Sequence, residues 1–375
     1  MTNKNDQWSH WLTSQTDSIR AAGQWRQPVA FDAVGPTGTF NGKLVTSFAS
    51  NDYLGLTHHP VVSAAAQAAI GRWGTGSGAS RLIVGSRPLH HDLEDAIATW
   101  RHTESAMLFP TGFAANLGLL SCLGSPGVRI HSDELNHASI IDGCRMARMN
   151  GAMLSIYRHR DLQQLEVHLA EPGADRQIVV TDSVFSMDGD VIDFAALVAL
   201  CERYDALLIL DEAHGVLQSV PVAGSSDVTI VQVGTLSKSV GSLGGFVAAP
   251  TSIIELLVNR ARSYIFTTAP SPADTAAALA AIEIITSDEG AALISRLRQL
   301  VERVKPGHHS PIIPIVLGDE QSALNAARSL LEKGILVPAI RPPTVPVGSS
   351  RLRVALSAAH TDEQIEALLK ALHEL

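Results

Sequence analysis

Short apolar runs separated by longer helical patterns make up most of the chain between about residues 48 and 270. Several of the runs are apolar on both faces, which is typical of strands in a parallel sheet covered by helices on both sides. The alternation predicts an α/β fold, a large domain around a mostly parallel sheet. The predicted strands are 106–109, 128–130, 153–156, 178–180, 206–210, 230–233 and 245–248.

The segments on either side of this region have different patterns. Trp8, Trp11, Leu12 and Ile19 partly follow a helical period, so we expect an amphipathic helix and then a loop, with a turn at 35–38. An alanine-rich helix at 273–285 leaves the large domain, and a smaller C-terminal α/β domain follows it. Its predicted elements are strands at 312–316 and 351–356 and a closing helix at 362–372. The predicted domains are an N-terminal helical arm (1–47), a large domain (48–285) and a small C-terminal domain (286–375).

Composition narrows the possible functions. The 375 residues are 46% hydrophobic with a formal net charge of -9, which favours a large core and disfavours non-specific nucleic-acid binding. The three cysteines form no CxxC motif, so we expect no disulfide framework, no metal site and a reducing cytosol. The polar N-terminus and the lack of an 18-residue apolar run predict a cytoplasmic protein with no membrane partner.

Lys238 and Asp211 carry the main chemical signal. Lys238 lies among small residues just after the run at 230–233, and Asp211 ends the run at 206–210. Pyridoxal phosphate (PLP) requires this pair, because the lysine forms a Schiff base with its aldehyde and the acid keeps its ring nitrogen protonated. The alternatives are a surface lysine and, for Asp211-Glu-Ala-His214, a helicase-type magnesium motif, which the absence of a GxxxxGK[ST] loop disfavours.

A phosphate site is predicted beside this pair. Thr111 is suited to cap a helix whose free amides at Gly112 and Phe113 would face an anion, and Thr235 could donate to the same phosphate. Taken alone, residues 111–116 also fit an ordinary strand-to-helix turn.

Three polar side chains are candidates for holding the PLP ring. His137 could stack on the ring, although a helix-capping or core histidine is the commoner fate. Ser186 could donate to the ring oxygen, although residues 184–190 also fit a simple turn. His214 could reach the same oxygen. The histidine pairs 58–59, 90–91 and 308–309 lack metal-ligand spacing and are expected at the surface.

Nine ordered motifs spread over nearly the whole chain resemble one family. They are Ser50–Leu56, Gly74–Arg81, Thr111–Asn116, Asn136–Ser139, Val184–Asp190, Asp211–Gly215, Thr235–Lys238, Phe266–Thr268 and Arg351–Arg353. Together they resemble the α-oxoamine synthases, which belong to the fold-type I (aspartate aminotransferase-like) superfamily of PLP enzymes. A set of ordered motifs is far more specific than any one of them.

The resemblance implies a role for each matching position. It implies that Lys238, Asp211 and His137 are catalytic and that Asn51 and Arg353 hold the amino-acid carboxylate. A further substrate contact near the N-terminus would be Arg26, Arg20 or a position that is not an arginine. Thr268 would reach the phosphate of the neighbouring subunit's cofactor in a homodimer. The implied cofactor-binding set is Gly112, Phe113, His137, Ser186, Asp211, His214, Thr235, Lys238 and Thr268.

The resemblance also implies a reaction. L-Alanine would condense with pimeloyl-CoA, or a pimeloyl-carrier protein, with loss of CO2, in biotin biosynthesis. Glycine C-acetyltransferase, 5-aminolevulinate synthase and serine palmitoyltransferase share this chemistry, and Ala213-His-Gly215 favours the alanine-using enzyme among them. An aminotransferase and a PLP-binding relative without activity are the alternatives outside this group.

Overall fold

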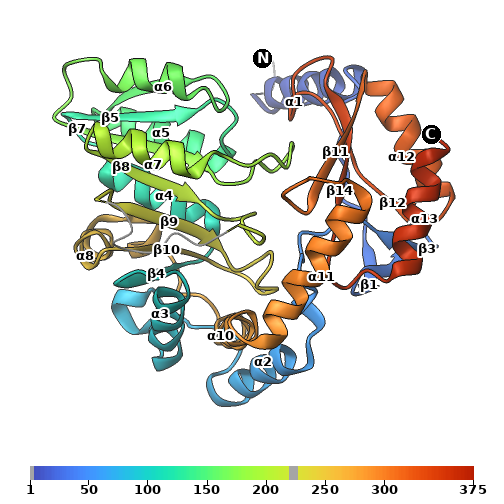
Figure 1. Ribbon diagram of the computed structural model, residues 1–375, viewed down its shortest axis with the longest axis horizontal. Coiled ribbons are helices and arrows are strands. Elements are labelled where there is room, and N and C mark those ends of the chain that lie inside the picture. The colour runs from blue at the N-terminus through green and yellow to red at the C-terminus, as the bar shows by residue number, and fades with distance from the viewer. Residues whose placement is uncertain (1–3, 219–226) are drawn as a thin grey trace.

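The computed structural model describes residues 4–218 and 227–375 (Figure 1). The helices are α1 Lys4–Ala21, α2 Pro60–Trp73, α3 Pro88–Trp100, α4 Gly112–Leu123, α5 Ala138–Met149, α6 Leu162–Leu169, α7 Phe194–Arg203, α8 Thr251–Arg260, α9 Arg262–Ile265, α10 Pro272–Ile285, α11 Asp288–Val304, α12 Glu320–Glu332 and α13 Asp362–His373. The strands are β1 Phe31–Val34, β2 Thr37–Phe40, β3 Lys43–Ser47, β4 Ser105–Phe109, β5 Val128–Asp133, β6 Met153–Tyr157, β7 Arg176–Asp182, β8 Ala206–Asp211, β9 Ile230–Thr235, β10 Gly245–Ala249, β11 Ile312–Gly318, β12 Ile335–Leu336, β13 Ala339–Ile340 and β14 Ser350–Ala355.

A seven-stranded sheet forms the large domain, in the order β4-β10-β9-β8-β7-β5-β6. Only β10 runs against its neighbours, and the other pairings from β9 to β6 are parallel. All seven strands that the apolar runs predicted are present, and the mostly parallel sheet is confirmed. Parallel strands bring their carboxyl ends to one edge of the sheet, where α/β proteins bind ligands.

Helices cover both faces of this sheet (Figure 1). Successive strand residues point to opposite faces, so Ile178 and Val180 pack with α4, α5 and α8, while Val179 packs with α6 and α7. Leu120 and Leu197, fully or almost fully buried, mark the two helical layers. Because helices pack on both faces of the sheet, its strands are apolar on both faces. The same packing holds the edge of the sheet in a fixed position.

The smaller C-terminal domain contains a three-stranded sheet in the order β11-β14-β13. A second sheet, β1-β2-β3-β12, combines strands from both ends of the chain. The prediction of a helical arm ending in a loop was therefore wrong for residues 31–47, which form three strands. Asn41 and Gly42 both have positive φ and join β2 to β3 in a tight hairpin, and β3 pairs with β12 in parallel. The predicted domain boundaries themselves stay predictions.

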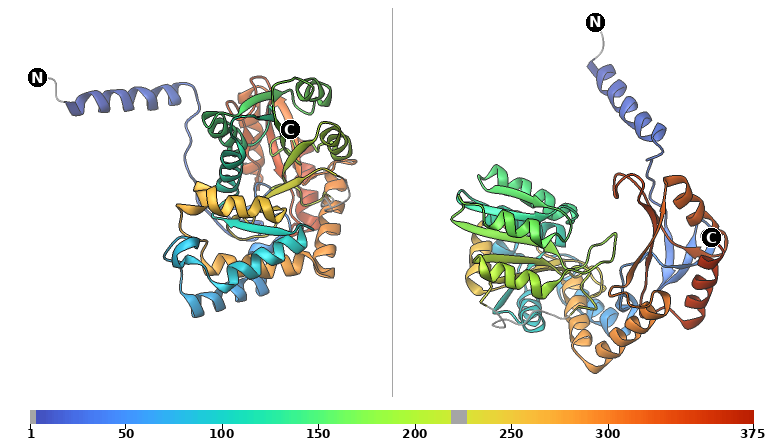
Figure 2. Two further views of the ribbon diagram at one scale, coloured as in Figure 1. Left: turned by 90° about the vertical axis from the view of Figure 1, so that its left-hand side faces the viewer. Right: turned by 45° about the horizontal axis from the view of Figure 1, so that its top comes forward.

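The predicted N-terminal helix is present as α1, and it stands clear of the rest of the chain (Figure 2). Its Trp8 side chain is 68% exposed and contacts Trp11 edge-on. The segment after the helix is attached to the small domain, because Arg341 Nη1 donates to the Gly23 carbonyl at 2.8 Å. The apolar residues of α1 are thus available to another surface.

His90 corrects the prediction that the histidine pairs lie at the surface. Its ring is fully buried, accepts from the Arg87 amide through Nδ1 and contacts the Pro270 carbonyl through Nε2.

Cys122, Cys144 and Cys201 are free. None of the helices in the described part of the chain combines the length and apolar character needed to cross a membrane. Residues 4–218 and 227–375 contain no group of three or more potential metal-ligating His, Cys, Asp or Glu side chains.

Candidate active site

Polar residues gather where three neighbouring parallel strands end. Asp182 ends β7, Asp211 ends β8 directly opposite it, and Thr235 ends β9. Both aspartates are buried, and Lys238 lies in the loop that follows β9. The structure therefore brings the predicted lysine and acid to the same edge of the sheet.

A continuous hydrogen-bonded chain starts at Lys238. Its Nζ lies 2.8 Å from His214 Nε2, and His214 Nδ1 lies 2.6 Å from the hydroxyl of Tyr53. That hydroxyl donates to Asn51 Oδ1 at 3.0 Å. Because Tyr53 has one proton and gives it to Asn51, His214 donates through Nδ1 and accepts from Lys238 through Nε2.

Arg353 on β14 joins this chain from the small domain. Its Nη2 donates to Asn51 Oδ1 at 3.1 Å, and its Nε donates to the carbonyl of Ser186 at 2.6 Å. The guanidinium is buried. Asn51, Ser186, His214, Lys238 and Arg353, which lie far apart in the sequence, are thus linked by hydrogen bonds in one place.

Asp211 is held by neutral donors. Asn116 Nδ2 donates to Oδ2 at 2.7 Å, and the Ala213 amide donates to Oδ1 at 2.9 Å. The same Asn116 amide donates to Ser139 Oγ, which lies 2.7 Å from His137 Nδ1. Both hydrogen bonds that orient Asp211 therefore come from uncharged donors. A buried carboxylate of this kind is suited to a cationic ligand.

His137 occupies the helix-capping position that the sequence left open as an alternative. It is the N-cap of α5, its ring accepts from the Ser139 amide, and its own amide donates to Asp182 Oδ2. Capping fixes the ring beside the sheet edge, so the cap and a stacking role are compatible.

Burial lowers the pKa of each base in this region. It lowers the pKa of Lys238, although the carboxylates of Asp211 and Asp182 oppose it. Burial lowers the pKa of His214 well below its ordinary value, and Lys238 adds to this. The pKa of His137 is lowered for the same first reason, while burial beside Asp211 raises that of Asp182 well above its ordinary value.

The predicted phosphate residues lie together at the start of α4. Thr111 caps the helix, since its Oγ1 accepts from the Ala114 amide at 3.1 Å. A Cβ on Gly112 would lie 3.3 Å from Thr235, and one on Gly245 would lie 2.4 Å from the Gly112 nitrogen. The close approach requires glycine at 245 and brings the helix N-terminus against Thr235.

Three predicted residues are exposed. Phe113 is partly exposed beside the phosphate residues, Thr268 is exposed after α9, and Arg26 is exposed on the segment between α1 and β1. No contact in the described chain joins Thr268 or Arg26 to the Lys238 group, so their roles stay predictions. Arg20 pairs with Asp17 and lies over the Trp25 ring instead.

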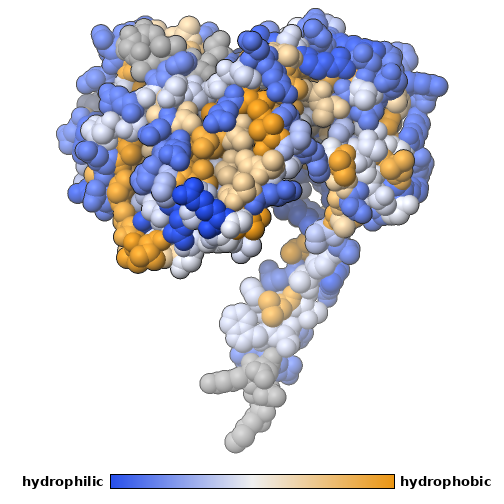
Figure 3. Space-filling view, turned by 90° about the horizontal axis from the view of Figure 1, so that it is seen from below, coloured by the Kyte–Doolittle hydropathy of each residue, from blue (hydrophilic) through white to orange (hydrophobic). Residues whose placement is uncertain are grey.

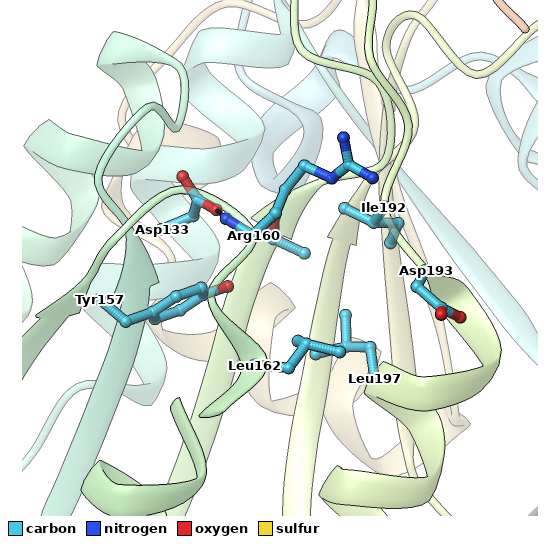
Figure 4. A pocket seen from close by; sticks show the side chains of 8 residues that line it. Asp133, Tyr157, Arg160, Leu162, Ile192, Asp193 and Leu197 are labelled. Atoms are coloured by element: carbon cyan, nitrogen blue, oxygen red, sulfur yellow. Dashed lines mark hydrogen bonds between the residues drawn. The ribbon is translucent and has the colours of Figure 1, made fainter. Parts of the chain in front are cut away.

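A cavity of about 210 Å³ lies apart from Lys238 (Figure 4). Its polar side carries Asp133, Tyr157 and Arg160, and Leu162 and Leu197 close its apolar side. None of the residues bonded to Lys238, Asp211 or Arg353 lines it, so it is not the candidate active site.

The residues at the sheet edge fit PLP. The Asp211 carboxylate has neutral partners and suits a protonated ring nitrogen, the α4 N-terminus with Thr235 suits a phosphate, and the lowered pKa of Lys238 favours its nucleophilic form. Neighbouring elements contain Lys238, Asp211 and the contact between Gly112 and Thr235. PLP, a flat ring with a phosphate group, requires its partners to lie close together in this way.

Sequence reasoning missed Tyr53, Asn116 and Asp182. Tyr53 lies two residues after Asn51, and Asn116 closes the motif that begins at Thr111, so both lay inside motifs already singled out. Asp182 ends a predicted strand next to the one that ends in Asp211, which was the available signal.

Comparison with known proteins gives one consistent result. The family described as "Aminotransferase class I and II" matches residues 43–372. The chain is 44% identical to 8-amino-7-oxononanoate synthase of Anaeromyxobacter dehalogenans, covering 96% of this chain and 94% of that protein. It is 42% identical to 8-amino-7-oxononanoate synthase of Alkalilimnicola ehrlichii, covering 98% of each.

The fold is similar to that of a PLP enzyme of solved structure. The structure of serine palmitoyltransferase from S. paucimobilis with a bound PLP–myriocin aldimine superposes with a TM-score of 0.89 at 28% identity. The superposition covers 97% of this chain and 96% of that one. The observed sheet, helical layers and small domain are thus those of fold-type I PLP transferases.

Proposed function

We propose that this chain condenses L-alanine with a pimeloyl thioester, because it belongs to the class I and II aminotransferase family and, within it, to the 8-amino-7-oxononanoate synthases. These synthases are PLP-dependent enzymes of biotin biosynthesis. The thioester is pimeloyl-CoA or a pimeloyl-carrier protein. The products are 8-amino-7-oxononanoate, CO2 and the free thiol of the carrier.

One observation carries the proposal. The hydrogen-bonded chain from Lys238 through His214, Tyr53 and Asn51 to Arg353 joins a base whose pKa burial lowers to a guanidinium suited to bind a carboxylate. An enzyme that removes a proton next to the carboxylate of an amino acid needs these two groups at a fixed separation.

The cofactor would be held by residues already in place. Lys238 would bind its aldehyde, Asp211 its ring nitrogen, Ser186 and His214 its ring oxygen, and Gly112, Phe113 and Thr235 its phosphate, with His137 over the ring. When bound, PLP supplies an electron sink for the carbanion at the amino-acid Cα.

Arg353 and Asn51 would orient the amino acid. A guanidinium binds a carboxylate through paired N–H groups, and the Asn51 amide adds a donor. With the carboxylate held there, Lys238 would be the base that takes up the Cα proton, since its lowered pKa favours the neutral amine.

The condensation balances with one proton from solvent. The alanine Cα gives its proton to Lys238 and forms a bond to the thioester carbonyl carbon, and the carbon–sulfur bond breaks to release a thiolate, which the solvent protonates to the free thiol. The alanine carboxylate then leaves as CO2, and Lys238 is placed to return a proton to the same carbon.

The proposal includes a homodimer. Thr268 is exposed, and so is the apolar side chain of Phe266 two residues before it, which is 70% exposed. Figure 3 shows hydrophobic side chains gathered on one face of the body and α1 projecting from it. A second copy of the chain would cover such surfaces and let Thr268 reach the phosphate of the neighbouring subunit's cofactor.

The release of free thiol tests this function. The PLP-loaded protein is mixed with pimeloyl-CoA and with L-alanine, glycine or L-serine in turn. Release with L-alanine alone is expected. Release with glycine or L-serine alone would move the protein to another acyl-CoA:amino acid C-acyltransferase, such as glycine C-acetyltransferase or the serine-using enzyme whose fold it shares.

A further inference from the structure

His159 lies between two carboxylates just after β6. Its Nδ1 lies 3.1 Å from Asp133 Oδ1, and its Nε2 lies 2.7 Å from Asp190 Oδ2. Asp133 is buried at the end of β5, and its other oxygen accepts from the Arg160 amide at 2.8 Å, as Figure 4 shows. The ring therefore joins the edge of the sheet to the loop that contains Asp190.

Both ring nitrogens face acceptors, so both must donate and the imidazole carries a positive charge. Burial alone would lower the pKa of His159, but the hydrogen bonds to Asp133 and Asp190 outweigh it and raise the pKa to about 9. The other charged or titratable groups around the ring are Arg160, which donates to Asp190, Glu134, which accepts from the His159 amide, and His308 on the far side of Asp190.

Two of the residues that His159 contacts, Phe185 and Asp190, lie at the two ends of one tight loop. The Phe185 amide donates to the Asp190 carbonyl, and Val184 pairs with Val191 just outside them. The His159 ring also packs edge-on against the Phe185 ring, with centroids 4.3 Å apart. One side chain therefore holds both ends of the loop against the sheet.

The tip of this loop reaches the active site and the small domain. The Ser186 carbonyl accepts from Arg353 Nε, and Asp188 pairs with Arg351. Gly189 has a positive φ, and a Cβ there would lie 1.9 Å from the Ile312 carbonyl, so the tip is packed tightly on β11. A displacement of the loop would move Ser186 and its carbonyl contact with Arg353 together.

We propose that His159 is a positioning residue, which holds the 184–191 loop so that Ser186 faces the cofactor and Arg353 faces the substrate carboxylate. This inference rests on the proposed function, because it assigns to His159 the geometry of groups that bind PLP and the amino acid. His159 itself touches neither.

The first test compares His159→Ala with a matched control, His373→Ala, which changes an exposed histidine in the last turn of α13. PLP affinity is measured by absorbance titration of the cofactor-free proteins, and kcat and KM for L-alanine are measured on the PLP-loaded ones. We expect His159→Ala to weaken PLP binding and raise KM roughly tenfold or more, with a smaller change in kcat.

The second test replaces the Asp190 carboxylate with an uncharged amide of nearly the same shape. Asp190→Asn lowers the pKa of His159, so the positioning should fail at lower pH than in the unaltered protein. KM for L-alanine is measured from neutral pH to above pH 9, where the unaltered protein should lose affinity as His159 loses its proton. The titration of L-alanine itself is common to both proteins, so the difference between the two curves reports on His159.

Each outcome has one meaning. Wild-type PLP affinity and KM in His159→Ala, or the same alkaline limb in Asp190→Asn, would overturn the inference. If the variants and the control unfold at the same temperature, the loss of affinity for PLP and L-alanine is local to the loop. A tenfold rise in KM with a preserved fold supports the inference. If the unaltered protein binds no PLP or releases no thiol with any amino acid, the proposed function fails instead.

Discussion

The two sides of the candidate active site are built differently. The large-domain side, with Lys238, Asp211 and His214, lies on the edge of a sheet covered by helices on both faces. The small-domain side, with Arg353 on β14, reaches the site through hydrogen bonds to Asn51 and to the Ser186 carbonyl, both of which lie within the predicted large domain. We infer that the large-domain side performs the chemistry and the small-domain side selects and orients the substrate.

Replacing Lys238 with Ala should have the largest effect, because it removes both the cofactor attachment and the base from the large-domain side. Thiol release should fall by about 10⁴-fold or more. Lys333→Ala, which removes a surface lysine paired with Glu374, serves as the control and should change nothing. A Lys238→Ala protein that turns over at the rate of the control would refute the assigned role.

Arg353→Lys tests the small-domain side. A lysine lacks the planar guanidinium fork, which can donate to the Ser186 carbonyl and Asn51 and still offer paired N–H groups to a carboxylate, so KM for L-alanine should rise roughly tenfold to hundredfold while kcat changes less. Arg296→Lys, on the outer surface of α11, is the control. If kcat falls and KM stays constant, Arg353 acts in the chemical step and the division between the two sides is wrong.

Lowering the pH should reduce the free energy of unfolding of the large domain. His131 is fully buried in β5, and burial lowers its pKa to about 4. The unfolded chain, with an ordinary histidine pKa near 6.5, binds more protons, so stability is full above pH 6.5 and is lost as pH falls toward 4. The loss at pH 5 is about 2 kcal/mol from this group.

His131→Gln should therefore reduce the difference in unfolding free energy between pH 7 and pH 5, measured by urea denaturation at each pH. His373→Gln should leave that difference as it is. An unchanged pH dependence in His131→Gln would show that other buried histidines dominate the acid response.

Tyr53→Phe should have the smallest effect, and it acts on the connection between the two sides. Burial raises the pKa of Tyr53 to about 12, so the hydroxyl stays protonated and links His214 to Asn51. Its loss should reduce kcat/KM roughly threefold to tenfold, the range of one net hydrogen bond. Tyr204→Phe, whose hydroxyl contacts Glu166 far from the site, is the control. An unaffected kcat/KM would mean that the two sides do not depend on this contact.

The sequence predicted the large sheet well because its strands are buried on both faces. Continuous apolar runs mark such strands, and a polar residue at the end of a run marks the candidate site, as Asp211 does at the end of β8. Lys238 was predictable for the same reason, since few functions place a lysine among glycines and small polar residues after a buried strand.

The strands at 31–47 were not predictable from burial patterns. Each is four or five residues long, and their sheet is completed only by β12. Asn41-Gly42 was the one strong local signal for a hairpin. Tyr53 and Asn116 also escaped notice, because their importance comes from contacts with His214 and Asp211 that only the folded chain creates.

The pairing of β3 with β12 has a consequence for how the protein is made. Thr46 pairs with Ile335, so a strand that leaves the ribosome early waits for a partner about 290 residues later. At about 5–20 residues per second, translation needs on the order of 15–60 s to supply that partner. During this interval the β1–β3 meander has an open edge, and the nascent chain depends on the shielding of that edge, by a chaperone or by its own hairpin, to avoid pairing with a neighbour on the same polysome.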